Sequence, residues 1–455
     1  MSRPASEFLH PAAPDIAALW PGHNATARSR SLYERAIKVM PGGSTRAGAY
    51  MAPYPPYVAR GQGCRVWDVD GNEYLDFANN FFSLVHGHAH PRILDAMTRM
   101  ARNGLAFGLP TESDVLLAEH LHARSPVLEH IRFMNSGTEA IMQAIKCARA
   151  ATGRPKIAKV EGAYHGSYDH IEISLDPTPE NWGDDLPVSI PFQKGTPPAV
   201  AADTVVIPFN DVARTHRAIE AHASKIAAVI VDPLPSRVGM VPATDAYLKA
   251  LREICTRHGI LLVFDEIISF RLGHGGAHRL FGAEPDLVAL GKVIGGGLPI
   301  GAVAGKAAAM SVFDNRKGKP PLSHSGTFTA NPVTMATGLA CMELLTPDAY
   351  AQLDALGARL RDGANALLLQ KGIAGIVTGM GSLFRIHLGK TDVHDYRSQW
   401  PSDAQRGQIA RLHRFFMASG MLLTPNCSGS LSTPMTEAEI DRFLAVLAEG
   451  IDAVA

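Results

Sequence analysis

The stretch Pro285-Asp-Leu-Val-Ala-Leu-Gly-Lys-Val-Ile-Gly-Gly-Gly-Leu-Pro-Ile300 places a lysine directly after a short apolar run. Leu287 to Leu290 form the run, Gly291 follows it, and three glycines come shortly after Lys292. A short apolar run between turn residues predicts a buried strand, and a lysine at its end loses hydration, which disfavours the ammonium form. Lys292 is therefore a candidate amine nucleophile for a carbonyl. Taken alone, a surface lysine at a strand end is the simpler interpretation, so the decision rests on other parts of the chain.

The region from about residue 110 to 335 alternates amphipathic helices with short, continuous apolar runs. This pattern predicts a mainly parallel sheet with helices on both faces. The expected strands are Ile131 to Met134, Ile157 to Val160, Val205 to Pro208, Ala227 to Val231 and Ile260 to Phe264. The expected helices include Ser113 to Arg124, Ala140 to Ala150 and Ala246 to Arg257. Residues 175 to 203, rich in proline, are expected to form a surface excursion of the kind that often borders active sites.

The two ends of the chain differ from this central region. Residues 1 to about 25 predict an irregular arm without a secretory signal, and Asp70-Gly71-Asn72 predicts a hairpin between two short strands. Beyond Pro347, one long helix, a few strands and a last helix with a Thr436/Glu439 capping box predict a smaller α+β domain. The predicted fold class is thus α/β, with an N-terminal arm and part of the small domain in 1–90, a large domain in 91–340 and the rest of the small domain in 341–455.

Composition excludes several classes of partner. The 43 basic residues balance the 43 acidic ones, which argues against nucleic acid or an anionic membrane as a partner. No run approaches ~20 uninterrupted apolar residues, so no spanning helix is expected. The five cysteines are scattered without a CxxC pair, which argues against a disulfide framework or a structural zinc site and suits the cytoplasm. His86, His88 and His90 lack a carboxylate or cysteine to complete a metal set, so they predict a loop packed by histidines.

A phosphate-binding turn is predicted at Phe133-Met-Asn-Ser-Gly-Thr-Glu139, where a strand turns into a helix. Ser136 and Glu139 fit a capping box. A helix N-terminus with a glycine and two hydroxyls offers free N–H groups, side-chain donors and the positive end of the helix dipole to an anion. The alternative is a plain helix cap without a ligand.

Two further features follow strand ends. Tyr164-His-Gly166 comes just after one strand, and its tyrosine could stack on a flat ring or pack into the core. Leu261-Leu-Val-Phe-Asp-Glu266 delivers Asp265 to the carboxyl end of a buried strand, where ligands of open α/β sheets bind. A buried aspartate needs a cationic partner. That partner could be the protonated nitrogen of a pyridine ring or a structural arginine such as Arg271.

These features occur in the order that one pyridoxal phosphate cofactor requires: a phosphate-binding turn, a tyrosine that can stack on the ring, a carboxylate and a lysine. Asp265 would keep the ring nitrogen protonated, and Lys292 would hold the aldehyde as a Schiff base and later move the proton. Each feature is weak alone, whereas four of them on successive strands indicate one site.

The chain resembles the class III (subgroup II) aminotransferases of fold type I, in the branch with glutamate-1-semialdehyde aminomutase and β-amino acid aminotransferases. The resemblance runs from about Tyr33 to the end of the sequence and rests on the motifs above, together with Pro41-Gly-Gly43 and His324-Ser-Gly-Thr-Phe-Thr-Ala-Asn-Pro332. It implies pyridoxal 5'-phosphate as cofactor, bound by Ser136, Gly137, Thr138, Tyr164, Asp265 and Lys292. It also implies a homodimer, in which Thr327 reaches the phosphate of the neighbouring subunit.

The resemblance also implies a substrate site. Arg46, after the Pro-Gly-Gly turn, would bind a substrate carboxylate, for which a guanidinium is well suited. Phe81, Phe82 and Tyr50 are candidate apolar walls, and Asp232 stands where relatives generally have glutamate. Asn426 stands where β-amino acid enzymes of this branch have an arginine for the second carboxylate of 2-oxoglutarate, which leaves the amino acceptor open.

The sequence therefore predicts a cytoplasmic, dimeric aminotransferase that moves an amino group from a β-amino acid or ω-amine to a 2-oxo acid. An aminomutase, which returns the amino group to an adjacent carbon of the same molecule, is the alternative within this chemistry. A pyridoxal phosphate-binding module without catalysis is the more remote alternative.

Overall fold

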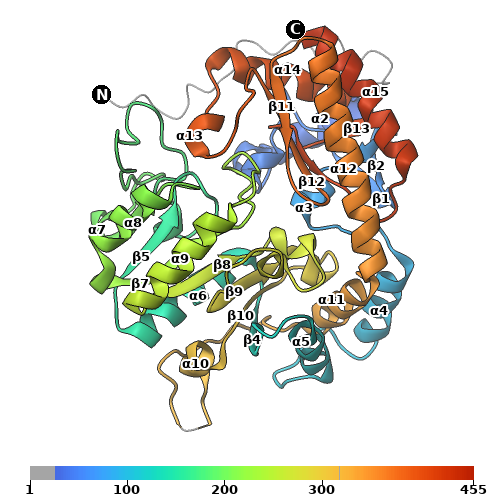
Figure 1. Ribbon diagram of the computed structural model, residues 1–455. Coiled ribbons are helices and arrows are strands. Elements are labelled where there is room, and N and C mark those ends of the chain that lie inside the picture. Colours follow the sequence, from blue (N-terminus) through green and yellow to red (C-terminus); the bar gives the residue numbers. More distant parts are fainter. Residues whose placement is uncertain (1–25, 317, 455) are drawn as a thin grey trace.

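A seven-stranded sheet forms the centre of the molecule in the computed structural model, which describes residues 26–316 and 318–454 (Figure 1). Its strand order is β4-β10-β9-β8-β7-β5-β6. The strands are β4 (His130–Met134), β5 (Lys156–Val160), β6 (Thr204–Ile207), β7 (Ile226–Val231), β8 (Leu261–Asp265), β9 (Leu287–Gly291) and β10 (Gly301–Gly305). The irregular arm predicted for the first 25 residues lies outside the described residues.

The sheet is mainly parallel, as predicted. β9, β8, β7, β5 and β6 pair in parallel, whereas β10 runs antiparallel between β4 and β9. β10 was not predicted, because Gly301-Ala-Val-Ala-Gly305 follows the glycines after Lys292 and lacks bulky β-branched residues apart from Val303.

Helices cover both faces of this sheet, which explains why its strands are apolar throughout. Val229 and Val231 of β7 pack toward α8 (Val212–Glu220) and α9 (Asp245–His258), while Ala228 and Ile230 belong to the cluster around α6 (Gly137–Thr152). The remaining helices of this region are α4 (Pro91–Ala101), α5 (Glu112–Arg124), α7 (Pro198–Ala202), α10 (Ala307–Met310) and α11 (Pro332–Leu344).

Two smaller sheets lie above the large one in Figure 1. One joins β1 (Val58–Gln62), β2 (Arg65–Asp68) and β3 (Glu73–Asp76) to β13 (Met421–Leu422), and the other consists of β11 (Gly375–Thr378), β12 (Leu383–Leu388) and β14 (Ser428–Ser430). Their helices are α2 (Ala27–Ala36), α3 (Asn79–Phe82), α12 (Pro347–Gln370), α13 (Tyr396–Gln399), α14 (Asp403–Ala418) and α15 (Glu437–Val454).

The N-terminal and C-terminal parts of the chain thus share one sheet, because β3 pairs in parallel with β13. The largest apolar cluster is continuous from Leu290 and Ile294 near the large sheet to Phe384, Phe416 and Phe443 near the small ones. Division at residues 90 and 340 stays a prediction, and residue 340 lies inside α11.

The loop of residues 175–203 lies against α13 rather than along the cavity at the carboxyl edge of the large sheet. Trp182 contacts the rings of Tyr396 and Trp400, and Arg397 donates hydrogen bonds to the carbonyls of Trp182 (2.8 Å) and Gly183 (2.7 Å). The loop is therefore an excursion, as predicted, but not one that lines the pocket.

The histidine loop packs as predicted. The ring of His86 lies within hydrogen-bond distance of the Thr433 hydroxyl (2.9 Å) and the Cys341 carbonyl (3.0 Å). His88 Nε2 lies 2.7 Å from a carboxylate oxygen of Asp76. The His86 contacts tie the loop before α4 to the C-terminal part of the chain, whereas the His88 contact holds it to β3.

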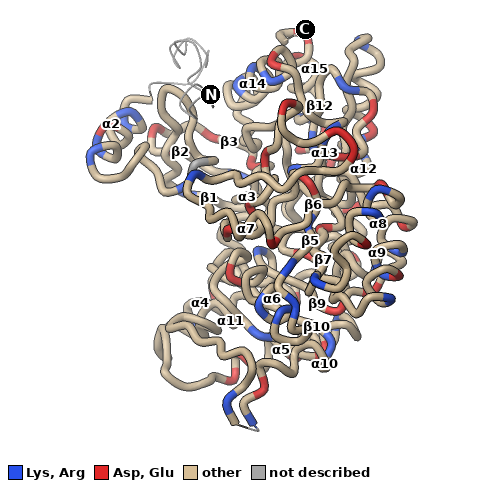
Figure 2. The backbone as a smooth tube through the Cα atoms, turned by 90° about the vertical axis from the view of Figure 1, so that its left-hand side faces the viewer, with Lys and Arg blue, Asp and Glu red and all other residues tan. Residues whose placement is uncertain are grey.

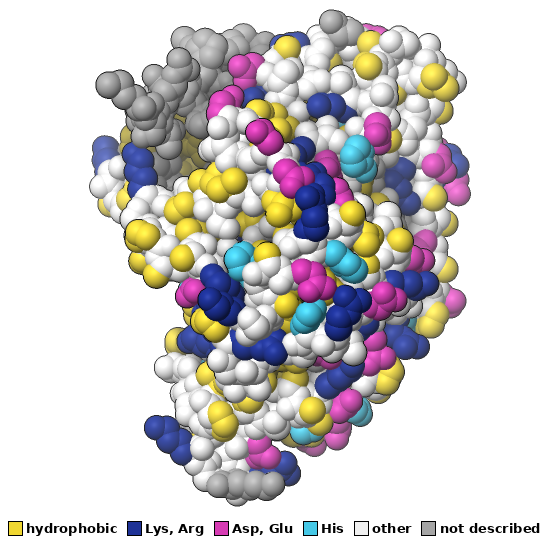
Figure 3. Space-filling model, turned by 60° about the vertical axis from the view of Figure 1, so that its left-hand side comes forward, with side chains coloured by type: hydrophobic (Ala, Val, Ile, Leu, Met, Phe, Trp, Pro, Cys, Tyr) yellow, Lys and Arg dark blue, Asp and Glu magenta, His cyan; other side chains and the backbone are white. Residues whose placement is uncertain are grey.

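Surface charge is mixed rather than concentrated. Figure 2 shows basic and acidic residues interspersed along the backbone, and Figure 3 shows their side chains interspersed across the face that is in view. Among the described helices, none combines the length and the apolar character that crossing a membrane requires. All five cysteines are buried and unpaired.

Candidate active site

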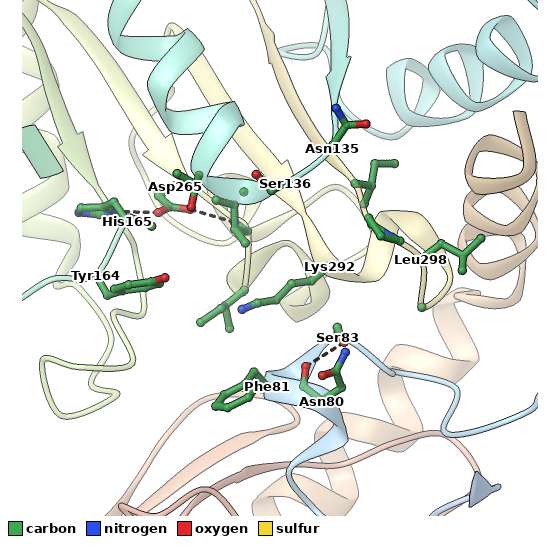
Figure 4. A pocket seen from close by; sticks show the side chains of 18 of the residues that line it. Asn80, Phe81, Ser83, Asn135, Ser136, Tyr164, His165, Asp265, Lys292 and Leu298 are labelled. Atoms are coloured by element: carbon green, nitrogen blue, oxygen red, sulfur yellow. Dashed lines mark hydrogen bonds and ion pairs between the residues drawn. The ribbon is translucent and has the colours of Figure 1, made fainter. Parts of the chain in front are cut away.

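A cavity of about 390 Å³ opens at the carboxyl edge of the large sheet and brings most of the predicted site residues together (Figure 4). The strands β4, β5, β7, β8 and β9 all end at this edge, so the residues that follow them converge. The predicted residues on its wall are Arg46, Phe81, Ser136, Gly137, Thr138, Tyr164, Asp232, Asp265 and Lys292.

The turn after β4 caps α6 with Ser136, whose hydroxyl oxygen accepts the Glu139 N–H (3.2 Å). The predicted return bond is different: Glu139 accepts the N–H of Asn135 (2.8 Å), one residue before the cap. Gly137 packs closely against Ile267: a Cβ there would lie 2.7 Å from Ile267 Cδ1, so that side chain would have to move. The N–H groups of Gly137 and Thr138, at the very start of α6, have no acceptor within the helix, so they are available to an anion in the cavity.

Lys292 directly follows β9 and lies on the cavity wall. Its φ of 50° is in the left-handed region, which turns the chain sharply away from the strand. In Figure 4 its side chain extends between Tyr164 on one side and Asn80 and Phe81 on the other. Burial lowers the pKa of Lys292 to about 8, against the opposing effect of Asp265 and Asp232. A substantial neutral fraction at neutral pH makes its amine a usable nucleophile and base.

Asp265, at the end of β8, is buried and held by two hydrogen bonds. Its Oδ2 lies 2.7 Å from His165 Nδ1, and its Oδ1 accepts the N–H of Ile267 (3.0 Å). The alternative partner Arg271 is wrong, because that guanidinium donates to the Phe82 and Leu431 carbonyls and to the Ser382 hydroxyl. His165 stood inside the Tyr164-His-Gly166 motif, but its role was missed because nothing local to it indicates a partner 100 residues away.

Asp232, at the end of β7, lies beside Asp265 because Val231 pairs with Phe264 in the sheet. Its Oδ1 accepts the N–H of Leu234 (2.9 Å) and the hydroxyl of Ser269 (3.2 Å). Burial, reinforced by the neighbouring Asp265, raises the pKa of Asp232 well above its usual range. Asp232 therefore tends to hold a proton.

Tyr164 is not a packed core residue, the alternative considered from sequence. It is 45% exposed and lies on the cavity wall opposite the loop residues (Figure 4). Gly166 has a φ of 99°, and a Cβ there would lie 2.8 Å from Thr138 Cα. This close approach brings the Tyr164 segment against the start of α6, where Thr138 Oγ1 accepts the N–H of Ser167 (3.1 Å).

The opposite wall is an unusual turn that sequence reasoning missed. The four residues from Asn79 to Phe82 all have positive φ, between 45° and 71°, although none of them is glycine. Such backbone is costly outside glycine and asparagine and persists where the surroundings hold it. Asp76 accepts the Asn79 N–H (2.8 Å), and the Asn79 side chain donates to the Ser430 carbonyl (2.7 Å). The turn presents Asn80 and Phe81 to the cavity (Figure 4).

Arg46 reaches the cavity from the segment after the Pro-Gly-Gly turn. Its Nη1 donates to Asn80 Oδ1 (2.7 Å), and among the described residues it has no carboxylate partner. Of the three candidate apolar walls, only Phe81 lines the cavity. Phe82 is buried in a core cluster with Leu234, and Tyr50 is exposed elsewhere.

Thr327 and Asn426 lie outside this cavity. Thr327 is exposed, in the segment between β10 and α11. Asn426 lines a separate cavity in the small sheets' region, where its Oδ1 accepts the Thr424 hydroxyl (2.7 Å). The other cavity residues not singled out from sequence are Asn80, Ser83, Asn135, His165, Gly166, Ile267, Ile268, Gly297, Leu298, Pro299 and Ile300.

The sequence and the fold both match known proteins. The family model of the class III aminotransferases matches residues 49–422. The chain belongs to the class III aminotransferase family. It is 36% identical over 431 residues to a glutamate-1-semialdehyde 2,1-aminomutase of Sorangium cellulosum, covering 93% of this chain and 96% of that protein.

Two solved structures are also similar. An omega-transaminase from Sphaerobacter thermophilus is 48% identical with a TM-score of 0.91, covering 94% of this chain and 98% of that one. A β-phenylalanine aminotransferase from Variovorax paradoxus is 35% identical with a TM-score of 0.86, covering 96% and 97%. The protein is thus an enzyme of the aminotransferase and aminomutase type.

Pyridoxal 5'-phosphate is the cofactor of this class III enzyme. The cavity residues fit it: unoccupied N–H groups and hydroxyls at the start of α6 suit the phosphate, and Tyr164 offers an exposed ring face. A buried carboxylate, Asp265, suits the pyridine nitrogen, and Lys292 brings an amine of lowered pKa to the aldehyde.

Proposed function

We propose that this enzyme transfers an amino group from a β-amino acid or ω-amine to a 2-oxo acid. The observation that carries the proposal is Arg46, a guanidinium on the cavity wall with a neutral amide as its partner and no carboxylate among the described residues. A guanidinium in this setting binds an incoming carboxylate by charge-assisted hydrogen bonds. Phe81 and the apolar residues Leu298 to Ile300 suit an apolar substituent of the same substrate.

The residues proposed to carry out the reaction, Lys292 and Asp265, lie on the cavity wall at the strand ends, across from Arg46 and Phe81. Bound pyridoxal phosphate supplies an electron-accepting ring that stabilises negative charge on the substrate carbon bearing the amino nitrogen. Lys292 would hold the cofactor's aldehyde, be displaced by the substrate amine, and then carry the proton to and from that carbon with its Nζ. The lowered pKa of Lys292 suits proton transfer, because a group whose pKa lies near the working pH can both accept and release a proton readily.

Asp265 would fix the ring nitrogen's proton through its carboxylate. His165 donates to the other side of that carboxylate and so orients it, as the partner of a buried acid does in many sites. Ser136, Gly137 and Thr138 would bind the phosphate, and Tyr164 would lie against the ring. Asp232, with its raised pKa, would contribute a neutral carboxyl beside Asp265 rather than a second negative charge.

An aminomutase is the second candidate, favoured by the Sorangium cellulosum relative that matches nearly the full chain. The same wall of reacting residues serves both reactions, since both remove and return a proton beside the amino nitrogen. They differ in the acceptor: an aminomutase needs no added 2-oxo acid, whereas an aminotransferase does.

A donor screen against pyruvate and 2-oxoglutarate tests the proposal. We expect β-amino acids or ω-amines to be consumed only when an oxo acid is added, with one oxo acid converted per amine. Complete turnover of a vicinal amino aldehyde without any added oxo acid would contradict it and support the aminomutase. Because Asn426 lies outside the active-site cavity, the choice between pyruvate and 2-oxoglutarate rests on the screen and not on that residue.

We further propose that two copies of the chain form the working enzyme. Leu105, Leu109 and Phe328 are exposed by 66%, 80% and 63%, and Asn331 ties their two loops together through the Leu105 carbonyl (2.7 Å). Large apolar side chains gathered on two joined loops are typical of a protein interface. Thr327, in the same loop as Phe328, would then reach the phosphate of the neighbouring copy.

Complementation between two defective variants tests this assembly. In mixed dimers of Lys292→Ala and Thr327→Val chains, a shared site predicts that one of the two sites has both native residues. Activity of the mixture well above that of either variant alone is the expected result, and a monomer by light scattering or no complementation would refute the arrangement.

A further inference from the structure

A second cavity, of about 270 Å³, lies between β12, the first part of α14 and the loop after β13. Figure 1 places these elements in the upper part of the molecule. No residue lines both this cavity and the active-site pocket. The small-sheet region therefore contains a hollow that the aminotransferase chemistry does not use.

The charged side chains that line this cavity are all positive. Three are cationic, Arg385, Lys390 and Arg406, and the described lining contains no aspartate or glutamate. Arg406 contributes least, because it already pairs with Asp403 (3.0 Å) and lies over the Trp400 ring. Positive charge from Arg385 and Lys390 is left without a counter-charge from the lining.

Arg385 lines this cavity and has one hydrogen-bond donor without a partner among the described residues. Its Nη1 donates to the Ser236 carbonyl (3.2 Å) and its Nη2 to Gln399 Oε1 (3.1 Å), while its Nε is shielded from solvent and has no acceptor in the described structure. Arg385 as a whole is half-buried, but an unpaired donor that is itself shielded from solvent is costly unless an anion or water accepts it. Burial lowers the pKa of Arg385 to about 10, and Arg237 adds to this.

Lys390 and Asn426 supply two further donors. Lys390 forms no ion pair among the described residues. Asn426 uses its Oδ1 to accept from the Thr424 hydroxyl (2.7 Å) and the Ser428 hydroxyl (2.9 Å), which leaves its amide N–H groups for other acceptors. His387 stays neutral, since burial, Arg385 and Lys390 lower its pKa to about 3. The lining thus offers several donors and little to accept from a ligand.

We propose that this cavity binds a small anion with at least two charged oxygens, held by Arg385, Lys390 and Asn426. Inorganic phosphate and a short dicarboxylate share this chemistry. Either anion would satisfy the orphan Nε and supply the missing negative charge.

Calorimetric titration of the holoenzyme tests the site, in a buffer free of phosphate, sulfate and carboxylates. Because the cofactor's own phosphate then fills the α6 site, added inorganic phosphate reports on the second cavity. One arm uses phosphate and the other succinate, and the tighter of the two identifies the physiological class of anion. We expect saturable binding of one anion per chain in at least one arm.

Three variants locate the binding. Asn426→Asp keeps the shape and the Oδ1 acceptor but adds negative charge, so it is expected to abolish binding. Lys390→Gln is expected to weaken it at least about tenfold, the scale of a hydrogen bond to a charged group. Lys194→Gln, which removes an exposed lysine outside both cavities, is the matched control and should bind like the wild type.

The Arg46→Ala variant separates the two cavities. It should retain the binding, whereas loss of succinate binding in that variant alone would assign the anion to the active site and overturn the proposal. Equal affinity in the wild type, Lys390→Gln and Asn426→Asp, or no saturable binding in either arm, would overturn it as well.

Discussion

The two walls of the active-site cavity are built in different ways. The strand-end wall carries Ser136, Asp265 and Lys292, each placed by a buried strand that ends at one edge of the sheet. The loop wall carries Arg46, Asn80 and Phe81, which are placed by a left-handed turn and a side-chain hydrogen bond. The first wall is more buried and carries the residues proposed to bind the cofactor, whereas the second is more exposed and carries those proposed to bind the substrate.

This difference predicts which mutations should affect every substrate and which should affect only some. Changes on the strand-end wall should lower the rate with every substrate, because they affect the cofactor. Changes on the loop wall should depend on the substrate, because they affect only the groups that the substrate carries.

The largest effect is expected for Lys292→Ala. Without its amine there is no group to hold the aldehyde and move the proton, so kcat should fall by about 10⁴-fold, the upper end of the scale for a lost general acid–base group. Steady-state assays with the best donor measure this. The absorbance of the lysine-bound cofactor should also be absent, and its persistence would show that another residue holds the aldehyde.

Asp265→Asn is expected to come next. The amide cannot hold the pyridine nitrogen's proton as a carboxylate does, so kcat should fall on the order of 10²- to 10³-fold, as for loss of one strong electrostatic contact. Asp232→Asn is the matched control on the neighbouring strand. Because the raised pKa of Asp232 already favours its neutral form, this variant should lose only a few-fold. Equal losses in the two variants would mean that the two carboxyls do not differ as described.

Arg46→Ala should lower kcat/KM by about 10- to 100-fold for donors that carry a carboxylate, since a hydrogen bond to a charged group contributes about 1.5–3 kcal/mol. Amines without a carboxylate should be affected much less. A comparison of paired donors, one with and one without the carboxylate, measures the split. An equal loss for both would place Arg46 in the cofactor wall instead.

The smallest expected effect is a pH dependence of cofactor capture. The pKa of Lys292 is lowered to about 8, so the neutral fraction of its amine rises steeply below that pH, is half complete there and levels off about one pH unit above it. The rate at which pyridoxal phosphate binds covalently to the apoenzyme should therefore rise from pH 6 to about 9 and flatten above it. A rate that keeps rising to pH 10 would indicate an ordinary, unperturbed lysine.

The strand-end wall was also the part that sequence could predict. A short apolar run followed by a polar residue is a local pattern, and Lys292, Asp265 and Ser136 each end such a run. Partners within the wall were harder to predict, because they come from distant segments. His165 rather than Arg271 pairs with Asp265, and Glu139 bonds to Asn135 rather than to the cap residue.

The loop wall could be predicted only through a family resemblance. Nothing local to Asn79 and Phe82 signals four consecutive left-handed residues, because several partners of that turn are distant in sequence: Asn79 donates to the Ser430 carbonyl, and Arg271 donates to the Phe82 carbonyl. The same limit applies to Phe82 and Tyr50, whose aromatic rings gave no sign of facing the core or the solvent. No local sequence pattern indicated a binding site at Arg385, because the cavity that it lines is formed by three segments distant in sequence.

The central claim is that Lys292 is the residue that holds the cofactor, and one measurement tests it most directly. The holoenzyme is treated with sodium borohydride, digested and mapped by mass spectrometry. The account predicts a single pyridoxyl-phosphate adduct, on the peptide that contains Lys292 and on that lysine. An adduct on any other lysine, or none in an enzyme that shows cofactor absorbance, would contradict it.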